Sequence, residues 1–406
     1  MLSRIFVAVL GACSLAAAAD EWPRFRGPNG SGIGKADIPA QWTDVNCKWK
    51  VKLPGVGHGS PVVFGGQVFL LCGNETTGQR TVVCLNAADG KILWQQNFDA
   101  LANKHHKFNS MASSTPAVDA DRVYFTWGTP QKLTVIAFTH DGKPAWEADL
   151  GPVQRQHGFG SSPILHDDLV ILSNDQESDG HLFALDRATG KVRWKLPRAE
   201  DHSNYSTPCI YTPPGGKPQV VVVSWRLGAT GVDAASGKQL WQMPLFAQKQ
   251  ERAIGSPSAS GDYVIVNCAF TAGPKHVVVL KPGQAPGTVQ EAWRLEKSVP
   301  HIPSPILVGD RAYLWSDDGI VTCAKLATGD IVWQERIEGT FFGSPVCTGD
   351  KIFSADKSGK VFALAAADKF QLLGTNPLND LCQTTPAIAG GRMFIRTYGT
   401  LHCVGK

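Results

Sequence analysis

An eight-bladed β-propeller with four-stranded blades is the all-β fold that this sequence of 406 residues predicts. The first observation is a phrase repeated eight times, in which a small hydroxyl or similar residue precedes a proline and a short hydrophobic run. The prolines are Pro61, Pro116, Pro163, Pro208, Pro257, Pro305, Pro345 and Pro386. The second is a turn of the type Asp-x-x-Thr-Gly-Lys that leads to a tryptophan, clearest from Asp186 to Trp194. Repeats of about 40 to 50 residues with several short strands each are typical of propellers.

Each repeat is expected to hold four strands, named A to D from the channel outward. In the third repeat they are Pro163–Leu165, Leu169–Ser173, His181–Leu185 and Lys191–Leu196. Their apolar alternation and β-branched residues favour strands, and the glycine between C and D supplies a positive φ. The 42 glycines and 26 prolines fit a fold with many tight turns.

The tryptophan of strand D is expected to wedge between neighbouring blades and bury about 200 Å². The predicted docking residues are Trp49, Trp94, Trp146, Trp194, Trp241, Trp293 and Trp333. In the seventh repeat, Phe370 or Leu373 is expected at this position.

The two ends of the repeat region are expected to share one blade. The last repeat, Pro386–Lys406, offers strands A, B and C, and Val45–Leu53 offers an isolated strand D with Trp49 in register. Pairing them leaves no open edge. We therefore expect a Gly/Pro-rich lead-in over 20–44, packed on a face of the ring, and a single propeller domain over 45–406. The glycines near residue 30 do not predict a dinucleotide site, because no strand precedes them and no helix follows.

Residues 1–19 resemble a signal peptide. Arg4 supplies the positive charge, Ile5–Leu15 is apolar, and three alanines precede Asp20. An alternative is a lipobox that ends at Cys13 and would anchor the protein through a lipid. We expect an exported protein, periplasmic or secreted, with no transmembrane segment and a monomeric state.

Ten cysteines and a net charge of +4 narrow the function classes. No basic run interleaves with aromatic residues, so nucleic acid is not an expected partner. Cys84, Cys323 and Cys403 fall where other repeats have alanine and are expected to be small buried residues. Cys47 and Cys403 are expected on neighbouring strands, and whether they form a bridge stays open.

Polar and aromatic side chains gather in the D–A and B–C segments, which emerge on one face of a propeller. We expect a ligand or partner to bind there, at the mouth of the central channel. The candidates are His58, His106, Arg155, His157, Asn174, His202, Trp225, Arg226, Arg252, His301 and Trp315. His105 and His106 are adjacent and are expected to point apart. The sequence gives no spacing that requires a metal, and no catalytic residue is predicted.

The run Leu182–Asp186, followed by Thr189, Gly190, Lys191 and Trp194, resembles the pyrroloquinoline-quinone-type repeat, and the resemblance extends from Cys47 to the C-terminus. The resemblance implies one of two branches: quinone-dependent alcohol and sugar dehydrogenases, or the BamB-like exported propellers, which bind partners in outer-membrane assembly without catalysis. The dehydrogenases typically carry insertions, and many carry an adjacent Cys-Cys disulfide, which this sequence lacks.

The favoured hypothesis is a non-catalytic, BamB-like binding or assembly module of the cell envelope, with no cofactor. One alternative is an oxidoreductase that uses pyrroloquinoline quinone with calcium, where Arg155, Arg226 and Arg252 with Trp225 or Trp315 would hold the quinone. The other is a propeller that binds a glycan or small molecule. A shared fold does not decide among them.

Overall fold

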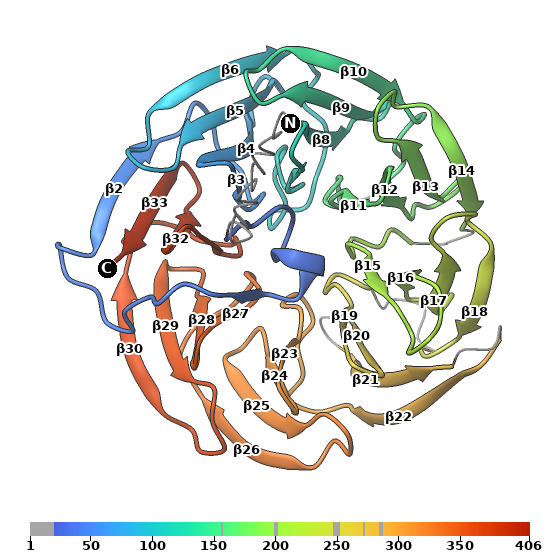
Figure 1. Cartoon of the computed structure of the whole chain (residues 1–406), viewed down its shortest axis with the longest axis vertical. Helices are drawn as coiled ribbons and strands as arrows, with labels where there is room; N and C mark the ends of the chain where they lie inside the picture. The colour runs from blue at the N-terminus through green and yellow to red at the C-terminus, as the bar shows by residue number, and fades with distance from the viewer. Residues whose placement is uncertain (1–19, 156, 199–201, 247–251, 271–272, 284–286) are drawn as a thin grey trace, which may run out of the picture.

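A computed structural model describes residues 20–155, 157–198, 202–246, 252–270, 273–283 and 287–406. Its strands form eight antiparallel sheets, arranged as blades around a central channel (Figure 1). This confirms the predicted eight-bladed propeller. Within the described residues, no helix is long and apolar enough to cross a membrane. The predicted signal peptide and Cys13 lie outside the described residues.

Blades I to IV follow one another along the chain, each with strand A innermost. Blade I has β3 (Val62–Phe64), β4 (Gln67–Gly73), β5 (Arg80–Asn86) and β6 (Ile92–Phe98). Blade II has β7 (Ala117–Val118), β8 (Arg122–Gly128), β9 (Leu133–Thr139) and β10 (Pro144–Asp149). Blade III has β11 (Ile164–His166), β12 (Leu169–Asn174), β13 (His181–Asp186) and β14 (Val192–Pro197). Blade IV has β15 (Cys209–Tyr211), β16 (Gln219–Ser224), β17 (Gly228–Asp233) and β18 (Gln239–Met243).

Blades V to VIII complete the ring. Blade V has β19 (Ser258–Ser260), β20 (Tyr263–Ala269), β21 (Lys275–Pro282) and β22 (Val289–Leu295). Blade VI has β23 (Ile306–Val308), β24 (Arg311–Trp315), β25 (Ile320–Lys325) and β26 (Ile331–Arg336). Blade VII has β27 (Val346–Thr348), β28 (Lys351–Ala355), β29 (Lys360–Ala365) and β30 (Leu372–Pro377). Blade VIII has β31 (Ala387–Ala389), β32 (Arg392–Arg396), β33 (Thr400–Gly405) and, as its outer strand, β2 (Cys47–Lys52).

The burial of the strands follows their place in the blade. All six residues of β12 are buried, because strand B has neighbouring blades on both faces, whereas β14 alternates between exposed and half-buried residues at the rim. A short 3-10 turn, η1 (Pro28–Gly30), and β1 (Ile33–Gly34) precede the blades. β1 adds to blade VII as a parallel neighbour of β27.

The tryptophans dock between blades in the manner predicted. The indole of Trp146 in blade II covers Gly190 in the C–D turn of blade III, and its Nε1 donates to the carbonyl of Arg187 at 3.0 Å. A Cβ on Gly190 would lie 2.4 Å from the indole, so only glycine permits this approach. The same arrangement joins Trp49 to Gly90, Trp94 to Gly142, Trp194 to Gly237 and Trp293 to Gly329.

Trp333 faces no glycine among the described residues, and its indole Nε1 donates to the carbonyl of Ala367 in blade VII at 2.9 Å. Phe370 packs against the ring of Trp333, so it is a docking partner and not the substitute tryptophan that the sequence suggested. Gly374 occupies the tryptophan position of blade VII, opposite Ala363. The carbonyl of Ala40 would lie 2.2 Å from a Cβ on Gly374, because the lead-in covers blade VII where a side chain would otherwise lie.

Trp241 is the second departure from the predicted docking. Its Nε1 donates to Gln219 within blade IV at 2.6 Å instead of to the next blade. Blade V lacks the short Thr-Gly turn. Its strand C ends at Pro282, and its strand D begins only at Val289. The indole is therefore turned inward over Gly231, the residue it faces in strand C.

Blade VIII closes the ring as predicted, with β2 antiparallel to β33. Trp49 lies opposite Cys403, and Cys47 lies opposite Val404. The bridge between Cys47 and Cys403 that the sequence left open is not formed, because the two residues are offset along the strands and every cysteine of the described chain is a free thiol. Cys84, Cys323 and Cys403 are buried opposite their tryptophans, and burial raises the pKa of Cys84 to about 12.

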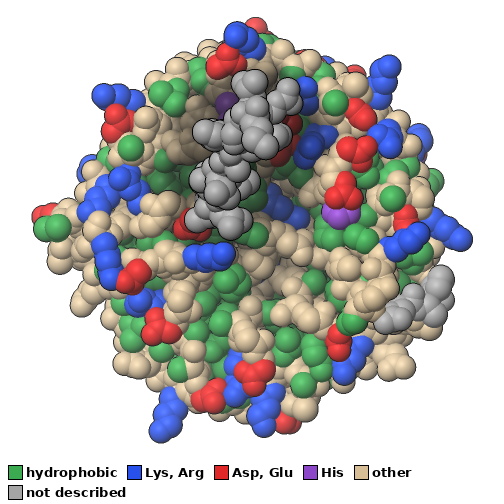
Figure 2. All heavy atoms as spheres, viewed as in Figure 1, with side chains coloured by type: hydrophobic (Ala, Val, Ile, Leu, Met, Phe, Trp, Pro, Cys, Tyr) green, Lys and Arg blue, Asp and Glu red, His purple; other side chains and the backbone are tan. Residues whose placement is uncertain are grey.

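The lead-in crosses one end of the channel, in dark blue at the centre of Figure 1. The buried Arg24 donates to the carbonyl of Pro208 in blade IV. The buried Arg26 donates to Ser258 in blade V and to the carbonyl of Pro305 in blade VI. Figure 2 shows this face, where acidic and basic side chains are interspersed around the rim. The channel is thus closed on the side of the A–B turns and approached from the side of the D–A segments.

Candidate functional site

The residues before the eight prolines form a closed ring of hydrogen bonds around the channel. In each blade the backbone N–H of this residue donates to the side-chain hydroxyl of the equivalent residue in the next blade, at 2.9 to 3.3 Å. We call this set the hydroxyl ring: Ser60, Thr115, Ser162, Thr207, Ser256, Ser304, Ser344 and Thr385. The last bond, from Thr385 to Ser60, joins the final blade to the first. The repeated hydroxyl-proline phrase therefore links the inner strands of all eight blades.

Above the hydroxyl ring the channel widens into a cavity of about 680 Å³, which we call the funnel. All eight ring residues line it, and Phe25 of the lead-in closes it from below. Its wall comes from the D–A segments, from Lys275 at the start of β21 and from Asp317 in the B–C segment of blade VI. The remaining lining residues include His58, His106, Lys107, Phe108, Asn109, His157, Tyr205, Arg252, Ile254, Lys275, His301, Ile302, Asp317, Thr340, Phe342 and Gln383.

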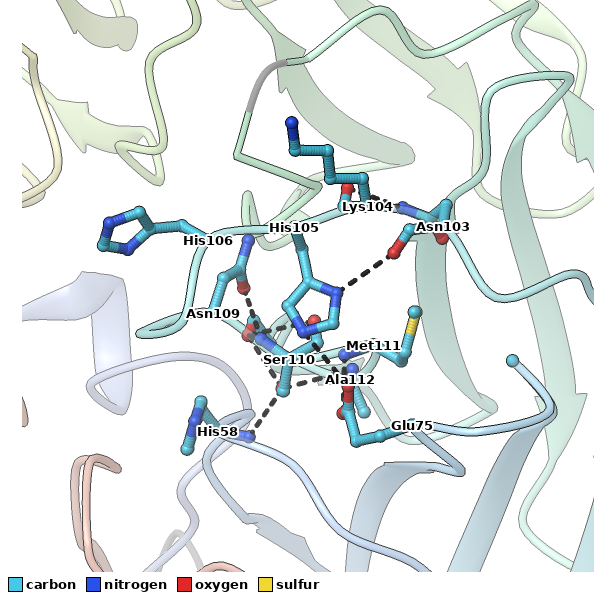
Figure 3. Close-up of polar contacts among 12 residues, drawn as sticks. His58, Glu75, Asn103, Lys104, His105, His106, Asn109, Ser110, Met111 and Ala112 are labelled. Atoms are coloured by element: carbon cyan, nitrogen blue, oxygen red, sulfur yellow. Dashed lines mark hydrogen bonds and ion pairs between the residues drawn. The ribbon is translucent and has the colours of Figure 1, made fainter.

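A long D–A segment, residues 99–116, lies over the wall of the funnel, and we call it the strap. Figure 3 shows that the side chains of the adjacent His105 and His106 point apart, as predicted. His105 lies against Glu75 of blade I, with Nε2 at 3.1 Å from the carboxylate. His106 points into the funnel and packs against His157, with ring centres 4.9 Å apart. The strap is thus fastened to blade I on one side and presents imidazole to the ligand space on the other.

The tip of the strap reaches from blade II to blade VII, past blades I and VIII. The ring of Phe108 packs on Phe342, with centres 4.9 Å apart. The amino group of Lys357 lies 4.6 Å from the centre of the Phe108 ring, at cation–π distance. These contacts narrow one side of the mouth with aromatic surface.

The funnel is electropositive, although its histidines are neutral. Burial, together with Arg396, lowers the pKa of His58 to about 3, and burial with Lys275 lowers the pKa of His301 to about 4. Each neutral imidazole then offers one donor and one acceptor. Lys107, Arg252 and Lys275 supply positive charge to the lining.

Asp317 is the one carboxylate among the residues that line the funnel. Its two oxygens accept the backbone N–H groups of His301 and Ile302 at 2.7 and 3.1 Å. Burial raises the pKa of Asp317 nonetheless. The oxygens of Asp317 are therefore held by the backbone, and its negative charge offsets part of the positive charge of Lys275.

Several buried polar atoms of the funnel have no partner among the described residues. They are Nδ1 of His58, Nε2 of His301 and the hydroxyl of Tyr205. His301 is only 7% exposed, so its unpaired nitrogen is costly unless a ligand or solvent reaches it. Such buried atoms call for a hydrogen-bond partner from outside the described residues, for example a ligand or water.

Five of the eleven candidates chosen from the sequence line the funnel together: His58, His106, His157, Arg252 and His301. Arg155 lies behind the wall, where it donates to Asn174 at 2.9 Å and packs on the ring of Tyr205. The structure does not bring the remaining candidates to the funnel. His202 packs on the buried Trp225, Arg226 is exposed, and Trp315 is fully buried against Phe341.

Other lining residues were not singled out from the sequence. The hydroxyl ring has a signal in the sequence, since a hydroxyl precedes the proline in every repeat, but the repeated phrase by itself predicts only the strands. Phe108, Phe342 and Lys275 carry no signal, because each occurs once and meets the others only through the closure of the ring.

The residues present do not fit the calcium ion that accompanies pyrroloquinoline quinone. Calcium takes six to eight oxygen ligands, with carboxylates among them. The funnel offers Asp317, whose oxygens are already used, and no group of three or more His, Cys, Asp or Glu side chains that could hold a metal occurs in the described part of the chain. Neither Trp225 nor Trp315 lines the funnel, so the predicted stacking surface for a quinone is not assembled.

A second hollow, of about 870 Å³, lies on the opposite face beside the lead-in. The ends of the inner strands of blades I to V line it, together with Arg24 and Asn29. Its acidic residues are largely paired within the chain, as in the contact of Asp119 with Arg187 at 3.4 Å. The buried Arg24 has an Nε with no partner among the described residues, but its Nη2 donates to the carbonyl of Pro208, so the chain itself holds the guanidinium.

Comparison with known proteins places the fold in a family. The family model described as outer membrane protein assembly factor BamB matches residues 41–208 and 206–335. A BamB from Yersinia pestis is 20% identical over 325 residues, which is 80% of this chain and 69% of that protein. A polyvinylalcohol dehydrogenase from a Pseudomonas species is 27% identical over 177 residues, which is 40% of this chain. The chain spans only 26% of that dehydrogenase.

Solved structures from both branches share the fold. BamB from Moraxella catarrhalis has a TM-score of 0.63 at 15% identity, covering 89% of this chain and 97% of that one. Quinohemoprotein alcohol dehydrogenase from Comamonas testosteroni has a TM-score of 0.69 at 13% identity, covering 97% and 82%. At these identities the likeness concerns the fold alone, and the chemistry of the funnel has to decide between the branches.

Proposed function

Because the chain belongs to the propeller family described as outer membrane protein assembly factor BamB, we propose that it is a non-catalytic binding module of the cell envelope. In this proposal the protein is exported by its first 19 residues. It takes a ligand, or a segment of a partner protein, in the funnel. The observation that carries the proposal is the funnel itself, where neutral imidazoles, lysines and aromatic rings from several blades surround one cavity.

The chemistry of the lining supports binding more than turnover. The imidazoles of His58 and His301 have pKa values near 3 and 4, well below the range in which a general base operates at neutral pH. The buried thiols have raised pKa values, so they are poor nucleophiles. What remains is a set of donors, cations and rings, which orient a ligand without reacting with it.

Site-specific crosslinking in living cells tests the placement. A photoreactive phenylalanine analogue in place of Phe108 would stand at the funnel mouth, and the same analogue in place of Leu93 would stand on the outer rim as a matched control. We expect a discrete adduct with an envelope component from position 108 and none from position 93. Adducts from position 93 alone would overturn the funnel as the binding site.

The dehydrogenase alternative has its own test. The purified protein would be titrated with pyrroloquinoline quinone and calcium, and dye reduction would be measured with alcohols, sugars and polyvinyl alcohol. We expect no dye reduction, because the lining lacks the carboxylates that calcium needs. Saturable quinone binding together with substrate-dependent dye reduction would replace the binding module by an oxidoreductase.

A further inference from the structure

The hydroxyl ring presents a circle of hydrogen-bond donors to the channel axis. Each ring oxygen accepts a backbone N–H from the neighbouring blade, as Thr207 accepts that of Ser162. Among the described residues, none of the eight ring hydroxyls donates its own hydrogen to a protein acceptor, although all eight residues are at least nine-tenths buried. A hydroxyl that already accepts a hydrogen bond is polarised and donates more strongly. Eight such hydrogens are thus available around one axis.

Positive charge lies on both sides of the hydroxyl ring. Above it, Lys275 and Arg252 belong to the funnel wall. Below it, Arg24 and Arg26 of the lead-in are 6% and 0% exposed, and within the described chain their hydrogen-bond partners are two backbone carbonyls and the hydroxyl of Ser258, not carboxylates. Burial lowers the pKa of Arg24 to about 10 and that of Arg26 to about 9, so both stay protonated at neutral pH. Buried cations that no acid compensates are unfavourable unless an anion is near.

A second observation points to a ligand at the same level. Among the described residues, neither Nε2 of the buried His301 nor the hydroxyl of Tyr205 has a partner, and both residues line the funnel. With a neutral imidazole, Nε2 or Nδ1 of His301 can carry the proton, so Nε2 is able to donate to an acceptor in the cavity. Donors and positive charge converge here, and the single lining carboxylate is occupied by backbone amides.

We propose that the hydroxyl ring, with Lys275 and His301 above it, is an oxyanion site that holds a carboxylate or phosphate group on the propeller axis. The proposal deepens the proposed function, on which it rests: the ligand of the funnel enters with its acidic group first. The body of the ligand then lies between Tyr205 and the Phe108–Phe342 pair. Cationic ligands are excluded by the field of the lysines and arginines.

Calorimetric titration with inorganic phosphate and with citrate, at constant ionic strength, tests the site. The proteins are the wild type, Thr207→Val, Lys275→Met and the control Lys143→Met, whose side chain lies exposed on a C–D turn. We expect saturable binding of at least one anion, with Kd raised tenfold or more by Thr207→Val and Lys275→Met and unchanged by Lys143→Met. Phosphate binding without citrate binding would assign a tetrahedral group, and the reverse a carboxylate.

Two outcomes would overturn the site: no saturable heat with either anion, or the same Kd in all four proteins, which would place the bound anion elsewhere on the protein. Since Thr207→Val also removes the acceptor of Ser162, Thr207→Ser is included and should restore binding. Failure of the oxyanion site is distinct from failure of the binding function. Crosslinks at position 108 without anion binding would contradict the oxyanion site but not the binding function. Anion binding with crosslinks only at position 93 would contradict the binding function but not the oxyanion site.

Discussion

At the scale of single residues, His301 couples the folded funnel to pH. Burial holds its pKa at about 4, below the ordinary 6.5, so the folded protein resists a proton that the unfolded chain accepts. The contribution of the neutral His301 to the free energy of unfolding is therefore fully present above pH 6.5. It falls by on the order of 3 kcal/mol as the pH falls toward 4. His301→Gln removes this loss. In urea unfolding, we expect the free energy of unfolding of the variant to rise relative to that of the wild type as the pH is lowered from 7.5 to 4.

The difference in unfolding free energy between the two proteins at pH 7.5 serves as the control. At that pH the imidazole of His301 is neutral in both the folded and the unfolded state, so any difference reflects packing. A difference between His301→Gln and the wild type that stays constant from pH 7.5 to pH 4 would contradict the buried, neutral His301.

A second residue-scale prediction concerns the hydroxyl ring. Thr115→Val keeps the shape of the side chain but leaves the buried N–H of Ser60 without its acceptor, which lies at 2.9 Å in the wild type. We expect a loss of about 1–3 kcal/mol in the free energy of unfolding, measured in urea. Thr115→Ser keeps the hydroxyl and should lose much less. Equal losses in the two variants would show that the methyl group, and not the hydrogen bond, matters.

At the scale of elements, the C–D turn is shaped by the tryptophan of the preceding blade. Gly190→Ala would place a Cβ 2.4 Å from the indole of Trp146 at a φ of +73°. Gly349→Ala is the matched control, since its φ is +59° and nothing lies within 4 Å. We expect about 1–2 kcal/mol of destabilisation for the control from φ alone, and about 2–5 kcal/mol for Gly190→Ala, by denaturant unfolding. Similar values for both would mean that the blades can shift apart at no cost.

The period of the tryptophans and prolines was sufficient to predict the blades, because each repeat buries the same face against its neighbour. The predicted tryptophan docking failed where the surface that faces the docking position differs from that of the other blades. Trp241 faces a longer hairpin in blade V and turns back to Gln219. Blade VII has Gly374 at the docking position because Ala40 lies there, over 300 residues away in sequence. Local sequence contains neither fact.

The site was predictable only at the level of the face. The D–A segments supply His58, His106, His157 and His301 to one funnel, as the topology of a propeller requires. Which side chains point inward depends on how long segments fold, and the strap decides this by fastening His105 to Glu75 so that His106 turns the other way. Trp225 and Trp315, attractive as stacking surfaces in the sequence, are used instead to fill the spaces between blades.

At the scale of the whole molecule, the lead-in joins blades that the ring alone would hold only to their neighbours. Besides the bonds of Arg24 and Arg26, Trp22 pairs with Val63 in blade I, and Gly32 accepts the N–H of Cys347 in blade VII. A chain without residues 20–34 keeps β2 and the eighth blade, so the ring should still form. Because it loses these contacts across the channel, we expect a single calorimetric transition with Tm lower by on the order of 10 °C. An unchanged Tm would mean that the hydroxyl ring and the tryptophans suffice for closure. The lead-in would then serve only to place Phe25 under the funnel.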